Sequence, residues 1–105
     1  MAELEPVGTE LLHVDATCRV WLLHLEPGEA TEWHTHDCDY VYTVTQSGTA
    51  RTEYEGGTSR EEGDSVGDAV HIPRDQRHRL VNTGDTPYTN VVVELLATRP
   101  SSAAG

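Results

Sequence analysis

The sequence predicts an all-β domain built as a sandwich or barrel, and three observations predict it. Apolar residues recur at a period near two along six short segments. Clusters rich in Gly, Pro, Asn and Asp separate those segments at short intervals. No segment carries an apolar stripe of helical period over three turns. Many short strands with evenly spaced turns are typical of antiparallel sandwiches and barrels, because these architectures leave few sheet edges exposed.

The first three strands are expected at 17–26, 39–46 and 48–55. The first reads TCRVWLLHLE and ends at the turn signal EPGEA. The second, DYVYTVTQ, alternates aromatic and β-branched residues and ends at QSG, which opens the third strand, GTARTEYE. The Gly pair in EGGT then ends the third strand.

The last three strands are expected at 68–73, 78–82 and 89–97. The first of them, DAVHIP, follows the polar turn EEGDSVGD. The short strand HRLVN follows IPRDQR, and the longest apolar run, TNVVVELLA, follows NTGDTP. These segments complete a set of strands without an intervening helix.

The chain length of 105 residues allows one domain, because a second core could not be filled from what remains. We expect a single domain over 1–105 with its core at about 11–97. Residues 1–10 and 98–105 are expected to be loosely attached termini.

Charge and cysteine usage narrow the range of partners. A formal charge of −11, with seven Arg and no Lys, argues against nucleic acid and anionic membranes, since both require a basic surface. The first residues, MAELEPVGTELL, lack the basic and apolar regions of a secretory signal, and no apolar window is long enough to span a membrane. Cys18 and Cys38 form neither a CxxC motif nor a disulfide framework. We therefore expect a reduced, cytoplasmic protein.

Two histidines stand two residues apart in a segment that otherwise reads as strand. Successive side chains of a strand alternate faces, so His34 and His36 point to the same side. Neutral imidazole is the commonest metal ligand among side chains. The pair therefore predicts half of a metal chelate, although half-exposed histidines on a polar strand face are a common alternative.

Two motifs with fixed spacing surround this pair. In the first, five residues separate Gly28 from His34-Thr35-His36, and Gly48 follows. In the second, five residues separate Gly67 from Pro73, Asp75 follows two residues later, and His78 and Asn82 complete it. Both motifs resemble those of the cupin family, whose second motif has Gly where this chain has Asp75. The resemblance covers about residues 17–97 and implies a cupin-type double-stranded β-helix, or jelly-roll barrel.

The resemblance also implies a metal site on His34, His36 and His78 at one end of the barrel. A degenerate cupin that keeps these histidines as polar core is the alternative. The family's fourth ligand, a glutamate, would fall at position 40 or 41, where this chain has Tyr40 and Val41. Asp39 stands one position early, so it would face away unless a bulge re-aims it. The sequence leaves open whether Tyr40 or Asp39 approaches the metal.

Three neutral ligands would leave coordination positions open and would suit an anionic or enolisable oxygen ligand. The expected function is an iron-dependent dioxygenase acting on a small organic acid or dicarbonyl, an analogy with three-histidine members of the family. Tyr40 and His71 are the candidate catalytic residues, for orienting substrate or moving a proton. Iron is the first choice of metal, with Zn, Mn, Ni or Cu as alternatives, because all of them accept three imidazoles.

Two other functions stay open from the sequence. One is a non-redox zinc cupin, such as an isomerase, cyclase or lyase. The other is a barrel that binds a small ligand without catalysis. The segments WHTHDCDYVYTVTQSG and HRLVNTGDTPYTNVVVEL further resemble single-domain cupins, some of which carry a label relating to β-alanine degradation. We also expect a homodimer formed through an outer sheet.

Overall fold

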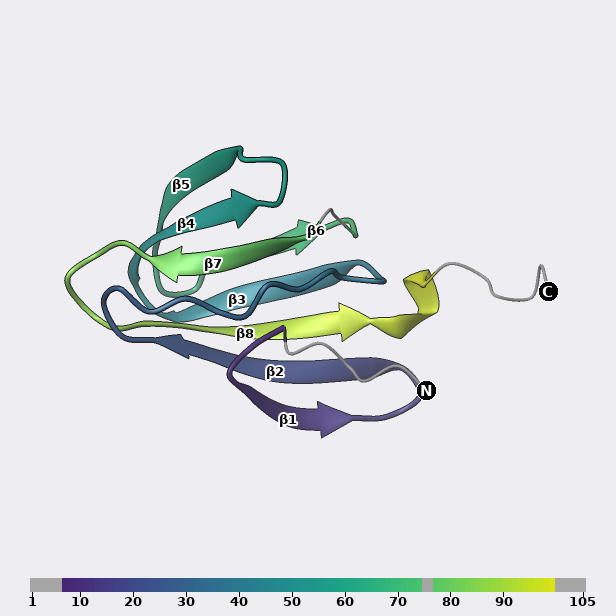
Figure 1. The fold of residues 1–105 in the computed structure, drawn as a ribbon. Coiled ribbons are helices and arrows are strands. Elements are labelled where there is room, and N and C mark those ends of the chain that lie inside the picture. Colours follow the sequence, from purple (N-terminus) through teal and green to yellow (C-terminus); the bar gives the residue numbers. More distant parts are fainter. Residues whose placement is uncertain (1–6, 75–76, 100–105) are drawn as a thin grey trace.

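The computed structural model describes residues 7–74 and 77–99, most of which lie in β-strands (Figure 1). Asp75 and the outer parts of the two expected loose termini, 1–6 and 100–105, lie outside the described residues. The elements are β1 (Glu10–Val14), β2 (Cys18–Leu25), β3 (Tyr40–Gln46), β4 (Gly48–Tyr54), β5 (Ser59–Asp64), β6 (Ala69–Ile72), β7 (His78–Asn82), β8 (Tyr88–Leu95) and a short 3-10 helix η1 (Leu96–Thr98). The predicted all-β class is confirmed.

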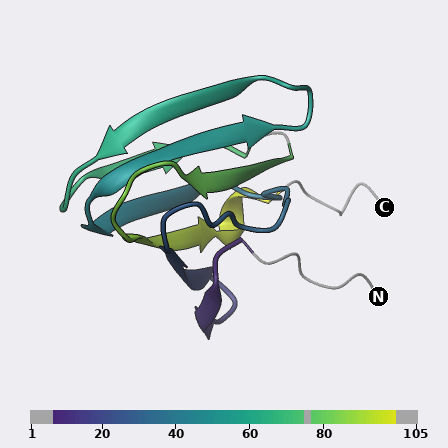
Figure 2. The ribbon, with the colours of Figure 1, turned by 60° about the vertical axis from the view of Figure 1, so that its left-hand side comes forward.

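Two antiparallel sheets make up the domain. The larger has the strand order β1-β2-β8-β3-β6 and the smaller has the order β5-β4-β7. The smaller sheet lies above the larger in Figure 1, and the turned view of Figure 2 shows the two layers facing each other. Bridges from Ala30 to Val81 and from His34 to His78 place the connection between β2 and β3 alongside β7. This connection carries the histidine pair to the space between the sheets.

Strict alternation on β2 and β8 decides what fills that space. Each strand buries every second residue, as the alternating sequence predicted. Leu23, Leu25 and Tyr88 pack with Val44 and Ala50 into one apolar cluster. Trp21 and Val92 form a second cluster with Val7, which precedes β1. Polar side chains occupy other inward positions and form the sites described below.

Three glycines of the two motifs stand where the structure requires glycine. Gly28 and Gly67, which open the two motifs, have φ values of +85° and +93°, a region that other residues rarely adopt. Gly48 serves a different purpose, because a Cβ there would lie 3.2 Å from two side-chain atoms of Tyr88. Backbone conformation therefore explains the glycines at 28 and 67, and the lack of space for a side chain explains the glycine at 48.

Cys18 and Cys38 are both free thiols. In the part of the chain that the structure covers, no helix is long and apolar enough to cross a membrane.

Candidate metal centre

Three histidines from two distant segments converge inside the domain. His34 and His78 face each other across a pair of backbone hydrogen bonds, each 2.9 Å from nitrogen to oxygen. His36 follows on the same side, although residues 35–39 form no regular strand. The three side chains are 3%, 3% and 5% exposed, and one ring nitrogen from each lies within 4.8 Å of the others. The histidines predicted as metal ligands are therefore brought together.

A hydrogen bond orients the ring of His34, and a charged contact orients the ring of His36. Nδ1 of His34 lies 2.8 Å from the carbonyl oxygen of Glu32, so Nδ1 carries the proton and donates it. Nδ1 of His36 lies 3.6 Å from Oε2 of Glu94. A carboxylate at this nitrogen favours the same tautomer, which leaves Nε2 as the metal-binding lone pair.

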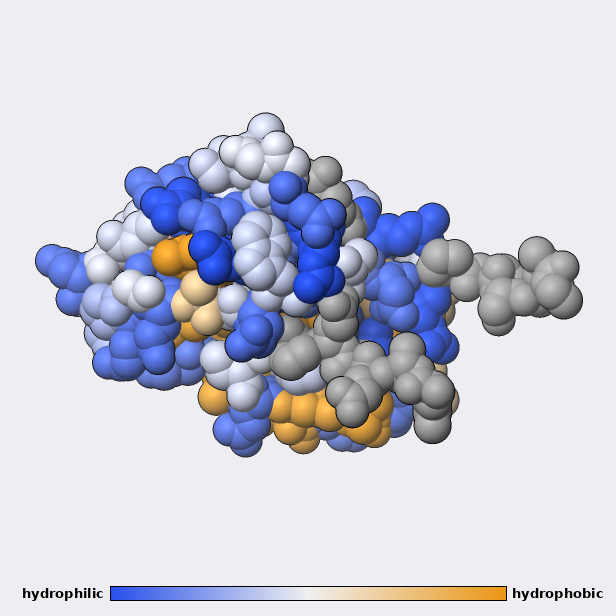
Figure 3. All heavy atoms as spheres, in the orientation of Figure 1, coloured by the Kyte–Doolittle hydropathy of each residue, from blue (hydrophilic) through white to orange (hydrophobic). Residues whose placement is uncertain are grey.

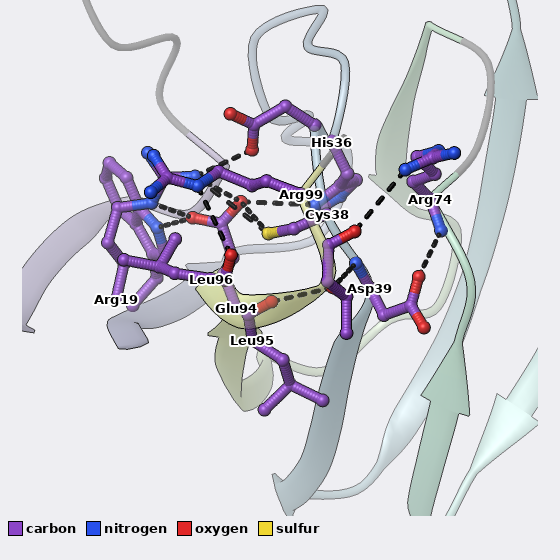
Figure 4. Close-up of polar contacts among 12 residues, drawn as sticks. Arg19, His36, Cys38, Asp39, Arg74, Glu94, Leu95, Leu96 and Arg99 are labelled. Atoms are coloured by element: carbon purple, nitrogen blue, oxygen red, sulfur yellow. Dashed lines mark hydrogen bonds and ion pairs between the residues drawn. The ribbon is translucent and has the colours of Figure 1, made fainter. Parts of the chain in front are cut away.

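Glu94 is a fully buried carboxylate on β8, held by three side chains (Figure 4). Nε1 of Trp21 donates to Oε1 at 2.8 Å, and the Arg19 guanidinium lies 3.0 Å from the same oxygen. Burial raises the pKa of Glu94, but the contacts with His36, Trp21 and Arg19 outweigh it and hold the pKa below its usual value. Glu94 is therefore an anion behind the ring of His36.

The sequence reasoning assigned no role to Glu94. A signal was present, because an acidic residue at an inward position of an apolar strand must have partners inside the domain.

The buried thiol of Cys38 lies in the same cluster, where Asp37, Cys38 and Glu94 each bring one potential ligand atom within 4.8 Å of the others. Burial and the charge of Glu94 raise its pKa to about 11, so the thiol stays protonated. Arg19 bridges Asp37, at 2.8 Å, and Glu94. The carboxylates of Asp37 and Glu94 are therefore both paired with Arg19.

The structure settles the orientation of Tyr40 and Asp39. Tyr40 faces inward and stacks on His36, with ring centroids 3.8 Å apart and an interplanar angle of 18°. Asp39 points away, toward His71 at 3.4 Å. Its carboxylate also accepts from the backbone nitrogen of Arg74 at 3.2 Å (Figure 4). The pairing of β3 with β8 shifts register between Val44 and Gln46, just before Gly48.

His71 is not brought to the three histidines. It pairs with Val41 across the sheet, and its side chain is 55% exposed on the outer face. Its neighbour Ile72, paired with Tyr40, faces inward and lines the cavity. The alternation of the strand therefore turns His71 away from the cavity.

The three histidines open into a cavity of about 110 Å³ between the sheets. Tyr40 and Tyr54 line it beside the histidines. The strand register places Thr52, Leu80 and Val92 at its middle and Asp64, Tyr88 and Asn90 farther along. A divalent transition metal fits the donor set, since three buried imidazoles with centroids 4.7–5.1 Å apart offer nitrogen ligands and no competing charge.

Comparisons with known proteins agree with this architecture. A cupin domain from Bordetella pertussis Tohama I has a TM-score of 0.76 and 24% identity, over 90% of this chain and 98% of that one. A double-stranded β-helix protein from Klebsiella pneumoniae has a TM-score of 0.69 and 23% identity, over 95% and 84%. A cupin sugar phosphate isomerase from Silicibacter pomeroyi has a TM-score of 0.54 and 27% identity, over 76% of this chain and 51% of that one.

No curated protein matches the chain. The family model described as a cupin domain matches residues 21–94, a range that contains both glycine and histidine motifs, strands β3 to β7 and most of β2 and β8. The chain therefore belongs to the cupin family.

Proposed function

We propose that this protein holds one divalent transition metal on His34, His36 and His78 and acts on a small organic acid or dicarbonyl in the cavity beside it. The convergence of three buried imidazoles carries the proposal. When bound, the metal supplies Lewis acidity and, in the case of iron, access to dioxygen chemistry. An iron-dependent dioxygenase is the leading form of this function.

Side chains that line the cavity would position the substrate and exchange protons with it. The apolar side chains of Leu80 and Val92 narrow the cavity and limit the water in it. Tyr40, stacked on His36, presents a phenol beside the metal ligands and is the proposed proton donor or acceptor. Burial raises the pKa of Tyr42 to about 12, so its phenol stays protonated and can donate a hydrogen bond to substrate.

Elemental analysis of protein purified without added metal or chelator tests the proposal. We expect about one equivalent of metal in the parent and none in a His34→Ala/His78→Ala double variant. The matched control is His24→Ala/His71→Ala, which removes two exposed histidines and should keep the metal. A parent that carries no metal and cannot be reloaded would refute the proposed function.

A non-redox isomerase is the second candidate, and the likeness to the Silicibacter pomeroyi isomerase favours it. In that form the metal is zinc or another ion acting as a Lewis acid only. Oxygen consumption separates the two candidates in a screen of diketones and keto acids, because only the dioxygenase takes up oxygen. Ligand binding without any turnover would instead identify a binding protein.

We further propose a cytoplasmic homodimer. The two free cysteines suit a reducing compartment. On the outer face of the larger sheet, Val20 pairs with Val93 and Val93 pairs with Val41, which makes an apolar row across three strands. These half-exposed side chains offer a surface for a second copy.

A further inference from the structure

A second polar cluster lines the cavity away from the histidines. We call Asp64, Tyr88 and Asn90 the distal cluster. The hydroxyl of Tyr88 donates to Oδ2 of Asp64 at 2.7 Å, and Nδ2 of Asn90 donates to the Tyr88 oxygen at 2.9 Å. Tyr88 and Asn90 are 1% and 3% exposed. The metal centre does not use this cluster.

The direction of these hydrogen bonds fixes the amide of Asn90. The Tyr88 hydroxyl has one proton and gives it to Asp64, so it can only accept from Asn90. The amide nitrogen must therefore face Tyr88, and the amide oxygen faces elsewhere. Within the described residues, this buried Oδ1 has no hydrogen-bond partner. A buried carbonyl without a donor is unfavourable, so Oδ1 calls for a donor that the chain does not provide.

The strand register places the distal cluster at the other end of the cavity from the metal centre. Asn90 and Glu94 share the inner face of β8, and four residues of strand span about 13 Å. Glu94 pairs with Tyr40, which stacks on His36. A molecule that reaches both ends must therefore carry two separate polar groups.

The charges along the cavity favour a cation or a neutral donor at this end. Arg60 is the cation among the described lining residues, and it is ion-paired with Glu62. Asp64 has no ion-pair partner among the residues that the structure describes. Its burial raises its pKa, which a positive group nearby would counteract.

We propose that the distal cluster is a second binding subsite, which takes a hydrogen-bond-donating group at the far end of the substrate, with a protonated amine preferred over a hydroxyl. The donating group binds Oδ1 of Asn90. The carboxylate of Asp64 favours a donating group that carries a positive charge. The inference rests on the proposed function for the identity of the other end, where an oxygen group of the same molecule faces the histidines. It narrows the substrate class to small acids or dicarbonyls with a terminal amine or hydroxyl.

Amide NMR titrations with three probes of equal chain length test this subsite. The probes are 5-aminopentanoate, 5-hydroxypentanoate and pentanoate, titrated into metal-free and zinc-loaded protein. We expect the side-chain amide signals of Asn90 to shift, with the amine binding about tenfold more tightly than pentanoate and the hydroxyl between them.

Two variants separate the acceptor from the charge. Asn90→Leu removes the acceptor and should reduce the preference for both donors to less than about threefold, read from the remaining cavity signals. Asp64→Asn should lower the amine's advantage over the hydroxyl and keep the hydroxyl's advantage over pentanoate. Asp64 is half-exposed, so its variant remains informative if Asn90→Leu fails to fold. Thr89→Val on the outer face of the same strand is the matched control and should keep the parental order.

Equal affinities for the three acids, or no binding by any of them, would overturn the subsite. So would a parental order of affinities in Asn90→Leu. The proposed function fails separately, by absence of metal binding. Donor preference without metal binding would leave the distal subsite standing, and metal binding without donor preference would leave the metal centre alone.

Discussion

Glu94 determines how firmly the metal centre is oriented. Its Oε2 lies 3.6 Å from Nδ1 of His36, and Arg19 and Trp21 hold the carboxylate in place. A carboxylate behind a ligating imidazole fixes the tautomer and raises the basicity of the metal-binding nitrogen. The three histidines alone therefore give an incomplete account of the site.

Replacing Glu94 with Gln should weaken metal binding by about 10- to 100-fold, because the neutral amide neither draws the Nδ1 proton as strongly nor raises ligand basicity. Competition against a chromophoric chelator measures the affinity. Asp37→Asn is the control, since it removes the other carboxylate that is paired with Arg19. Equal affinity in Glu94→Gln and the parent would contradict a positioning role.

Asn82, the last residue of the second motif, holds the turn between β7 and β8. It is 1% exposed, and its amide nitrogen donates to the carbonyls of Leu25 and Thr86 at 2.9 Å. Its amide oxygen accepts from the backbone nitrogen of Gly84 at 2.9 Å. One side chain thus links the end of β2 to this turn.

Asn82→Ala should lower the free energy of unfolding by about 2–4 kcal/mol, because it leaves buried backbone groups without partners. Chemical denaturation measures the loss, and the metal content of the folded variant should stay at the parental level. Asp85→Ala changes an exposed residue of the same turn and should have little effect. A variant that kept its stability but lost its metal would show that Asn82 acts in the metal centre instead.

Most of the strands that the sequence predicted have one buried face, although three of the four residues of the predicted β6 are exposed. Residues 78–82 and 39–46 match β7 and β3 to within a residue, because alternation reports a half-buried strand directly. β5 (SREEGD) was missed, since an exposed edge strand has no apolar face to alternate. β1 was missed for a similar reason, because all five of its residues are exposed and its apolar residues do not alternate.

The candidate site was predictable only in part. The histidines of both motifs could be identified by spacing, and inward alternation at Tyr40 followed from the strand. The partners of Glu94 and the amide of Asn90 could not, because they depend on the pairing of β8 with β2 and β3. Pairings between strands distant in sequence leave no local pattern.

At the scale of the whole molecule, the larger sheet leaves apolar side chains uncovered. Apolar side chains gather along the lower edge of Figure 3, where β1 carries Leu11, Leu12 and Val14, which are 40%, 49% and 55% exposed. The apolar row through Val93 lies on the same sheet. Such surface is typical of an interface.

We expect light scattering to give a mass of about 23 kDa, twice the 11.5 kDa of one chain. Val93→Glu should halve it, because the charge would be buried without a partner between the copies. Thr58→Glu, which adds the same charge in the exposed turn between β4 and β5, should keep the parental mass. A parent of 11.5 kDa would exclude the dimer.

Metal binding should stabilise the whole domain, since the ligands come together only when it is folded. At a free metal concentration of one hundred times the dissociation constant, the gain is about 2.7 kcal/mol. Differential scanning calorimetry should show a higher Tm with metal than with chelator. The shift should vanish in His34→Ala/His78→Ala and persist in His24→Ala/His71→Ala.

The bridge between His34 and His78 has a consequence for the order of folding. These residues are far apart in the chain, and their backbones pair only when the connection after β2 lies beside β7. Contacts between distant segments form late, because the intervening chain must first lose its freedom. The three ligands are therefore brought together only when the barrel closes. We expect metal to bind the folded domain and not to direct the early steps of folding.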